Sequence, residues 1–170
     1  MPINFYMFFI VALIPLIIGA VYYHPKVVGN AWMKTNGFTE ESLQGGNMML
    51  ILGLAYFFSF MISFFLPGMV IHQASIYSLL VPEVLESGSA VQQSFNTFMG
   101  EFADRHRTYS HGAVHGGITA VFFVLPVIAI NALFERRGWK YVLIHFGYWF
   151  ISLLLMGAVL CQTLNYPTLS

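Results

Sequence analysis

The sequence predicts an all-α integral membrane protein: a four-helix transmembrane bundle with an amphipathic surface helix between spans two and three. Hydrophobic residues make up 58% of the chain and charged residues only 8%, whereas roughly a quarter of the residues of soluble domains are charged. Several apolar runs also exceed the roughly 18 residues that mark a transmembrane candidate. At 170 residues, we expect residues 1–170 to form a single integral membrane domain.

Charge, cysteine content and motifs exclude several classes of function. Seven basic and seven acidic residues cancel, so we expect no nucleic-acid partner. The single cysteine, Cys161, excludes an internal disulfide and a multi-cysteine metal site. The chain has no nucleophile elbow, no His-Glu-x-x-His and no phosphate-binding glycine loop. No acidic residue lies deep in a span, which argues against an ion-coupled transporter.

The first span is expected over residues 3–23. No Lys or Arg precedes this apolar run and no cleavage pattern follows it, so it is interpreted as a retained span rather than a signal peptide. Pro15 removes one backbone hydrogen bond and should kink the helix, and His24 before Pro25 should end it. In the loop that follows, Thr39 precedes two glutamates, which predicts a helix N-cap.

The second span is expected over residues 48–71, with a bend near its end at Pro67-Gly68. The next stretch, 73–81, is too short to cross a bilayer and predicts a re-entrant or interfacial helix. Residues 90–107 predict an extramembrane amphipathic segment, because apolar residues recur there at helical spacing. The recurring residues are Phe95, Phe98, Met99 and Phe102.

The third and fourth spans are expected over residues 111–134, which include Pro126, and over residues 141–163. The first and third loops carry five basic residues, and the opposite side carries only Arg105 and Arg107. The positive-inside rule therefore predicts that these two loops lie in the cytoplasm and that both termini lie on the outer side. The five residues of the inner loops are Lys26, Lys34, Arg136, Arg137 and Lys140.

Depth divides the six histidines into two groups. His115 lies near the outer end of the third span and His145 near the inner end of the fourth. At about 1.5 Å rise per residue they differ in depth by roughly 15–20 Å, so they cannot bind one metal ion together. The outer group is His72, His106, His111 and His115, and the inner group is His24 and His145.

The outer histidines raise three hypotheses. His111 and His115 are four residues apart, as metal ligands on one helix face often are, and three or four such ligands suit zinc or a similar ion. The alternative without a metal is that imidazoles at headgroup level form hydrogen bonds to the backbone, to lipid phosphate or to each other. Because of this alternative, no cofactor is predicted. The third is proton handling or substrate contact, since histidine titrates near neutral pH.

Other polar residues also have two interpretations. Arg105 and Arg107 suit lipid phosphates or a partner's carboxylate, or else salt bridges to neighbouring acids. Arg136 and Arg137 suit a lipid or partner anchor, or else simply fix the topology at a tight turn. An inner polar face either lines a ligand cleft or forms the polar seam between packed helices. The residues of this face are His145, Tyr148 and Trp149.

Several short motifs resemble the small bacterial four-span membrane proteins of domain-of-unknown-function family 1761. The motifs are Tyr22-Tyr23-His24-Pro25, Gly29, Ala31-Trp32-Met33-Lys34, Leu133-Phe134-Glu135-Arg136-Arg137, Gly147-Tyr148-Trp149 and Leu155-Met156-Gly157. Members typically have Ser-Pro after the first aromatic pair, where this chain has His24, so no shared role is assumed there. Residues 90–107 look like an addition to the family core. The resemblance implies a multi-pass inner-membrane protein and no particular reaction.

We therefore expect a non-enzymatic structural or accessory component of the membrane that contacts lipids. A ridge of small residues lets another helix approach closely and favours packing with a second copy or a larger complex. The ridge consists of Gly112, Gly116 and Ala120. The alternatives are a small-molecule or lipid binding or transport protein with its site near the outer histidines, and a metal-dependent membrane enzyme that uses them.

Overall fold

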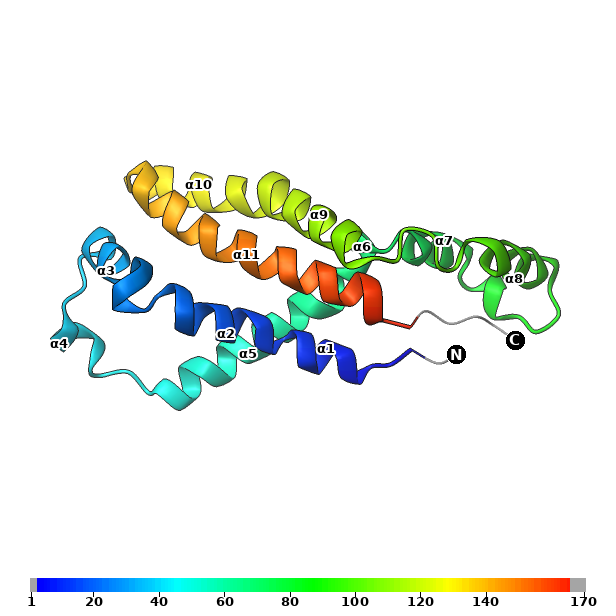
Figure 1. Ribbon diagram of the computed structural model, residues 1–170, viewed down its shortest axis with the longest axis horizontal. Helices are drawn as coiled ribbons and strands as arrows, with labels where there is room; N and C mark the ends of the chain where they lie inside the picture. The colour runs from blue at the N-terminus through cyan, green and yellow to red at the C-terminus, as the bar shows by residue number, and fades with distance from the viewer. Residues whose placement is uncertain (1–2, 166–170) are drawn as a thin grey trace.

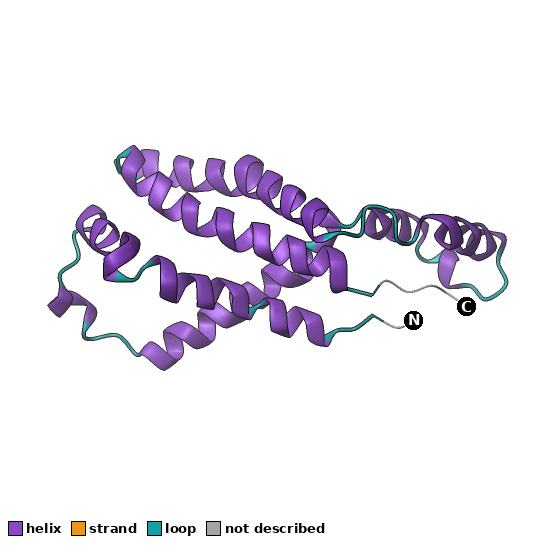
Figure 2. Ribbon diagram, viewed as in Figure 1, coloured by secondary structure: helices purple, strands orange, loops and turns teal. Residues whose placement is uncertain are grey.

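The computed structural model describes residues 3–165, and all regular secondary structure within them is helical (Figure 2). Three helices are long and apolar enough to cross a membrane: Met48–Val70, Tyr109–Phe134 and Trp139–Thr163. A fourth candidate is the pair Tyr6–Tyr22 and Pro25–Asn36, whose two halves are bent by 58°. The elements are α1 (Tyr6–Val11), α2 (Leu13–Tyr22), η1 (Pro25–Gly29), α3 (Asn30–Asn36), α4 (Glu40–Leu43), α5 (Met48–Phe65), α6 (Pro67–Val70), α7 (His72–Leu80), η2 (Glu83–Leu85), α8 (Ala90–Phe102), α9 (Tyr109–Thr119), η3 (Ala120–Val124), α10 (Leu125–Phe134) and α11 (Trp139–Thr163).

Prolines account for the interruptions of the long helices. The first apolar helix breaks at Ala12, one turn before Pro15, because the proline ring removes an i→i−4 hydrogen bond. A π-helical turn, η3, precedes Pro126 in the third apolar helix, and Pro67 opens α6 after the break at Leu66. By contrast, α11 has no proline and runs unbroken for 25 residues.

The helix α11 lies in the middle of the bundle, between α9–α10 on one side and α1–α2 on the other (Figure 1). Its core residues include Leu153, Met156 and Leu160, which pack with Val11 and Val70 in one buried cluster. Much of the remaining surface of the long helices consists of exposed Phe, Leu, Ile and Val. This is the distribution expected of helices that face lipid.

The two ends of the bundle differ in what they carry. One end carries the turn between α10 and α11 together with the loop around α3 and α4, where Thr39 and Ser42 form the capping box of α4. The predicted N-cap at Thr39 is therefore confirmed. At the other end the described chain begins and ends (Figure 1). Asn4 joins the two there: its Nδ2 donates to Thr163 O at 2.9 Å, and its Oδ1 accepts from Asn165 N at 2.7 Å.

The segment between the second and third long helices folds back on itself. The helix α8 buries Phe95 and Met99 against Val84 of η2 and against α7. Together α7, η2 and α8 extend beyond the bundle at the end where the described chain begins and ends (Figure 1). The helix predicted within residues 90–107 thus exists as α8; protein covers Phe95 and Met99 of its apolar face, whereas Phe98 is exposed.

Candidate functional site

Four histidine rings converge at the end of the bundle where the described chain begins and ends. Nε2 of His111 lies 3.0 Å from Nε2 of His72, and the ring centroids of His111 and His115 are 4.4 Å apart. His72 and His115 are 5.0 Å apart and nearly perpendicular. His106 stacks on His111 at 5.0 Å with an interplanar angle of 22°. The outer histidine cluster is thus His72, His106, His111 and His115.

Three members of this cluster lie close enough together that they could hold a metal ion. One ligand atom from each of His72, His111 and His115 lies within 4.8 Å of the other two. Zn–N bonds of about 2.0–2.1 Å place tetrahedral ligands about 3.3 Å apart, so small side-chain movements would bring the three nitrogens to bonding distance. His106 lies beside this group as a fourth imidazole, and three protein ligands with one open position are typical of catalytic zinc.

The sequence brings the ligands together through two helix starts. His72 is the first residue of α7, after the extended residue Ile71 breaks the long helix that ends with α6. On the other element, Thr108 caps α9 by accepting a hydrogen bond from His111 N at 3.2 Å. His111 and His115 then lie on one face of α9, one turn apart.

The loop that carries His106 is held from two sides. On one side, the buried amide Nε2 of Gln73 lies within hydrogen-bond distance of the carbonyl oxygens of Phe102, Ala103 and Arg105, at 2.8, 3.2 and 2.9 Å. His106 itself has a left-handed backbone with φ of 62°, a conformation that non-glycine residues adopt only when their surroundings hold them there. Sequence inspection missed Gln73; the only signal was an amide beside a histidine in an apolar stretch.

On the other side, Arg107 ties the same loop to α11. Its Nε donates to the carbonyl oxygen of Cys161 at 2.6 Å, and its Nη2 donates to that of Leu164. A cation at this position satisfies the last carbonyls of the helix and complements its dipole. Arg107, expected to hold a lipid or a partner, is therefore engaged within the chain. Arg105 is exposed, with its guanidinium carbon 5.4 Å from the centre of the Phe102 ring.

A small pocket of about 220 Å³ adjoins the cluster, between α7, α8 and the loop after α8. Its polar lining includes His72 and His106 of the cluster and Arg105 of the loop. Aromatic and aliphatic side chains form the rest of the lining. The full lining is His72, Gln73, Ile76, Phe98, Phe102, Arg105 and His106.

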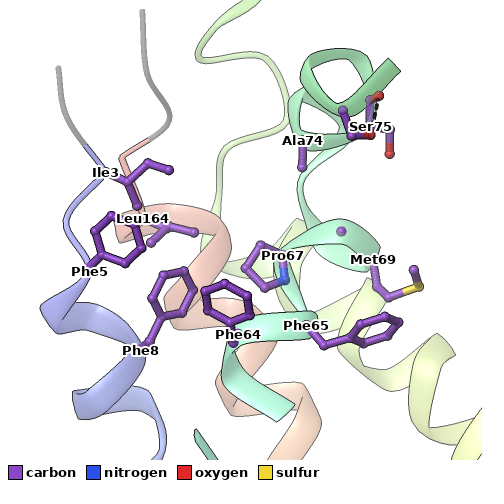
Figure 3. Close-up of a pocket in the computed structure, with 12 residues that line it drawn as sticks. Ile3, Phe5, Phe8, Phe64, Phe65, Pro67, Met69, Ala74, Ser75 and Leu164 are labelled. Carbon is purple, nitrogen blue, oxygen red and sulfur yellow. Dashed lines mark hydrogen bonds between the residues drawn. The ribbon is translucent and has the colours of Figure 1, made fainter. Parts of the chain in front are cut away.

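A second, larger pocket of about 600 Å³ lies on the other face of α7, between α1, α5 and α6 (Figure 3). The rings of Phe5, Phe8 and Phe64 gather on one side of it, and Pro67 marks the helix break that opens it. Ser75 supplies one of its few polar groups. None of the clustered histidines lines this pocket, so it is separate from the candidate metal site.

The inner polar face serves as a seam between helices. Tyr148 donates its hydroxyl to Pro15 O at 3.1 Å, and Tyr22 donates to Ile144 O at 3.0 Å, which joins α2 to α11. Nδ1 of His145 lies 3.5 Å from the Tyr23 hydroxyl, and its Nε2 is buried without a hydrogen-bond partner in the part of the chain described. The ring of Trp149 packs on Tyr148 with centroids 5.0 Å apart.

The basic turn lies at the end opposite the outer histidine cluster. Arg137 pairs with Glu135 at 3.8 Å and reaches Thr35 O at 3.4 Å, so the first and third loops meet at one end of the bundle. Arg136 is exposed and left-handed, with φ of 55°, within the tight turn before α11. The two ends therefore separate the histidine group from the basic group.

The ridge of small residues on α9 faces α11 of the same chain. A methyl group on Gly112 would overlap Gly157 O, and one on Gly116 would overlap Leu153 O. Ala120 is fully buried in the core. The ridge that we expected to meet a second copy or a larger complex is thus occupied within the protein, because close backbone approach is what holds α9 on α11.

Comparison with known proteins places the chain in a family without giving it a reaction. No curated protein and no solved structure matches the chain. A family model described as "Protein of unknown function (DUF1761)" matches residues 6–161. The matched residues include the candidate metal ligands, the polar seam between α2 and α11, and the first and third loops with their basic residues. The chain therefore belongs to the DUF1761 family.

Proposed function

We propose that this is a multi-pass protein of the bacterial inner membrane, with four spans formed by α1–α2, α5–α6, α9–α10 and α11. Three helices of sufficient length and apolarity support this number, and the fourth candidate is the bent pair that α1–α2 forms with η1–α3. The five basic residues of the first and third loops favour a cytoplasmic position for that end. The outer histidine cluster and both termini would then lie on the periplasmic side.

Within this setting, we propose that the protein binds a transition metal ion of the zinc class through His72, His111 and His115. The single observation that carries the proposal is that three imidazoles from two separate elements converge within 4.8 Å. Imidazole is a favoured ligand of zinc, copper, iron and nickel. With three protein ligands the ion would keep a position for water or substrate, the arrangement of a metal-dependent membrane enzyme.

The expected role as a non-enzymatic structural or accessory component has less support. Its main argument was the ridge of small residues, and the carbonyls of α11 already cover that ridge. Exposed apolar residues of the long helices need no protein partner, since lipid covers such surfaces in a membrane. A small-molecule or lipid ligand near the outer histidines remains compatible with the metal proposal, because the small pocket adjoins the cluster.

Elemental analysis of the detergent-purified protein tests the metal proposal. We expect about one equivalent of a transition metal in the wild type, and its loss in His72→Ala, His111→Ala and His115→Ala, because each variant removes one of three ligands. His24→Ala is the matched control: its ring accepts a hydrogen bond from Lys26 N, away from the cluster, so it should retain the metal.

The variant His106→Ala separates two forms of the site. Retained metal would support three ligands and an open position, whereas loss would indicate a closed, four-histidine structural site. A wild type that takes up no stoichiometric metal, even after incubation with excess zinc or cobalt, would contradict the proposal altogether.

A further inference from the structure

We propose that the small pocket between α7 and α8 binds the phosphate headgroup end of a lipid amphiphile and presents that headgroup to the metal centre. This inference rests on the proposed metal function and names the class of substrate for the same site. It follows from three features of the pocket: its position beside the cluster, an uncommitted cation at its border, and an aromatic wall.

The first feature is position. His72 belongs both to the metal triad and to the lining of the pocket, and His106 borders the pocket next to His111. A ligand in the pocket would therefore lie against His72 of the triad and against His106 beside it. Gln73, also in the lining, uses its amide to hold the carbonyls of the loop after α8, so the wall near the metal is fixed before any ligand arrives.

The second feature is charge. Arg105 lines the pocket and is exposed, and among the described residues it forms no ion pair and no hydrogen bond through its side chain. Its guanidinium carbon lies 5.4 Å from the centre of the Phe102 ring, a cation–π contact that orients the group at the pocket border. Arg107 is committed to the end of α11. A guanidinium and a divalent ion on one pocket favour a multiply charged oxyanion, above all phosphate.

The third feature is the apolar wall. Ile76, Phe98 and Phe102 form most of the pocket surface away from the histidines. Phe98 and Phe102 pack with ring centroids 4.8 Å apart and planes tilted by 36°, and Phe98 is 39% exposed. A free phosphate ion would leave this wall unused, whereas a phosphate attached to glycerol and an acyl chain would cover it. The volume of about 220 Å³ suits one end of such a molecule, below the roughly 300 Å³ at which drug-sized pockets begin.

Cobalt-substituted protein in a neutral detergent provides the test. Cobalt(II) at a histidine site absorbs visible light, and its spectrum changes when an anion enters the coordination sphere. The probes are inorganic phosphate and oleoyl lysophosphatidic acid, a single-chain phosphate monoester. We expect both to change the spectrum, and the lipid to do so at a concentration at least tenfold lower.

Two variants distinguish the contribution of the phosphate headgroup to binding from that of the acyl chain. Arg105→Gln should weaken binding of both probes by about tenfold or more, because a charge-assisted contact is lost. Phe98→Ala should weaken the lipid by about fivefold and leave phosphate unchanged, since only the chain covers that ring. Lys34→Gln, a change of an exposed basic residue of α3 at the opposite end, is the matched control and should change neither.

The outcomes distinguish this inference from the proposed function. No cobalt uptake overturns the metal function, and the inference with it. Cobalt uptake without a spectral response to either probe overturns the inference alone. A spectral response that is unchanged in Arg105→Gln would show that Arg105 does not bind the anion, and would overturn the inference. Equal affinity for phosphate and lipid, unaffected by Phe98→Ala, assigns the site to free phosphate and overturns the lipid class.

Discussion

The two ends of the bundle both gather aromatic and histidine side chains, but they use them differently. In the seam between α2 and α11, the Tyr22 and Tyr148 hydroxyls each donate to a main-chain carbonyl of the neighbouring helix. In the outer histidine cluster, His72 and His111 approach each other, and Gln73 holds the loop that carries His106. Hydroxyls that donate to main-chain carbonyls of a neighbouring helix indicate packing, whereas imidazole nitrogens from separate elements that converge on one point indicate a candidate site.

The largest expected effect is a difference in metal content between variants at the two ends of the bundle. Replacing His111 with alanine should abolish bound metal, whereas His145→Ala should leave the stoichiometry at the wild-type value, because His145 contacts Tyr23 and Tyr141 and none of the triad. Elemental analysis of the two purified variants measures the difference. Equal loss of metal in both would mean that the outer end is not the binding site.

The second effect concerns the support of the outer cluster. Gln73→Leu keeps the volume but removes the contacts to the loop after α8, so the metal affinity should fall by roughly ten- to a hundredfold, as for other groups that orient ligands. Competition with a chromophoric chelator measures it. Gln93→Leu, an exposed glutamine of α8, is the control. An unchanged affinity in Gln73→Leu would show that the loop does not position the ligands.

The third effect lies between the two ends, where α9 meets α11. Gly116→Ala should destabilise the protein by about 1–3 kcal/mol, because the added methyl group overlaps Leu153 O and pushes the helices apart. Gly53→Ala is the matched control, since no atom lies within 4 Å of its added methyl group. Thermal unfolding in detergent compares the two. Equal stability would mean that the helices approach less closely than described.

The smallest effect tests the inner seam. Tyr148→Phe removes the hydroxyl that donates to Pro15 O and should cost about 1 kcal/mol, the usual net value of one hydrogen bond. The metal content should not change. Tyr6→Phe, on a residue that is 61% exposed, should have no effect on thermal unfolding. A change of metal content in Tyr148→Phe would contradict the separation of the two ends.

Much of this arrangement follows from local rules that the sequence already contains. The apolar runs predict the long helices, Pro15 and Pro67 predict the breaks near them, and the spacing of His111 and His115 predicts one shared face. Depth along the helices also predicted that His72 and His115 lie at the same end of the bundle and that His145 lies elsewhere. Each of these predictions depends on residues close together in the chain or on helix length alone.

Contacts between distant segments were not predictable in the same way. Gln73 bonds carbonyls 29 to 32 residues away, and Arg107 bonds carbonyls 54 and 57 residues away. Main-chain carbonyls are the same in every residue, so the sequence carries no sign of which of them a side chain will meet. The ridge at Gly112 and Gly116 similarly predicted a close helix neighbour but could not tell α11 from a second copy.

Asn4, near the start of the chain, is hydrogen-bonded to Thr163 and Asn165, and this link has a practical consequence for handling the protein. It holds the beginning and the end of the described chain at the face that carries the imidazoles. A polyhistidine purification tag fused to either terminus would be anchored close to that face and would offer additional ligands to any ion there. A peptide tag without metal-binding side chains keeps the stoichiometry interpretable.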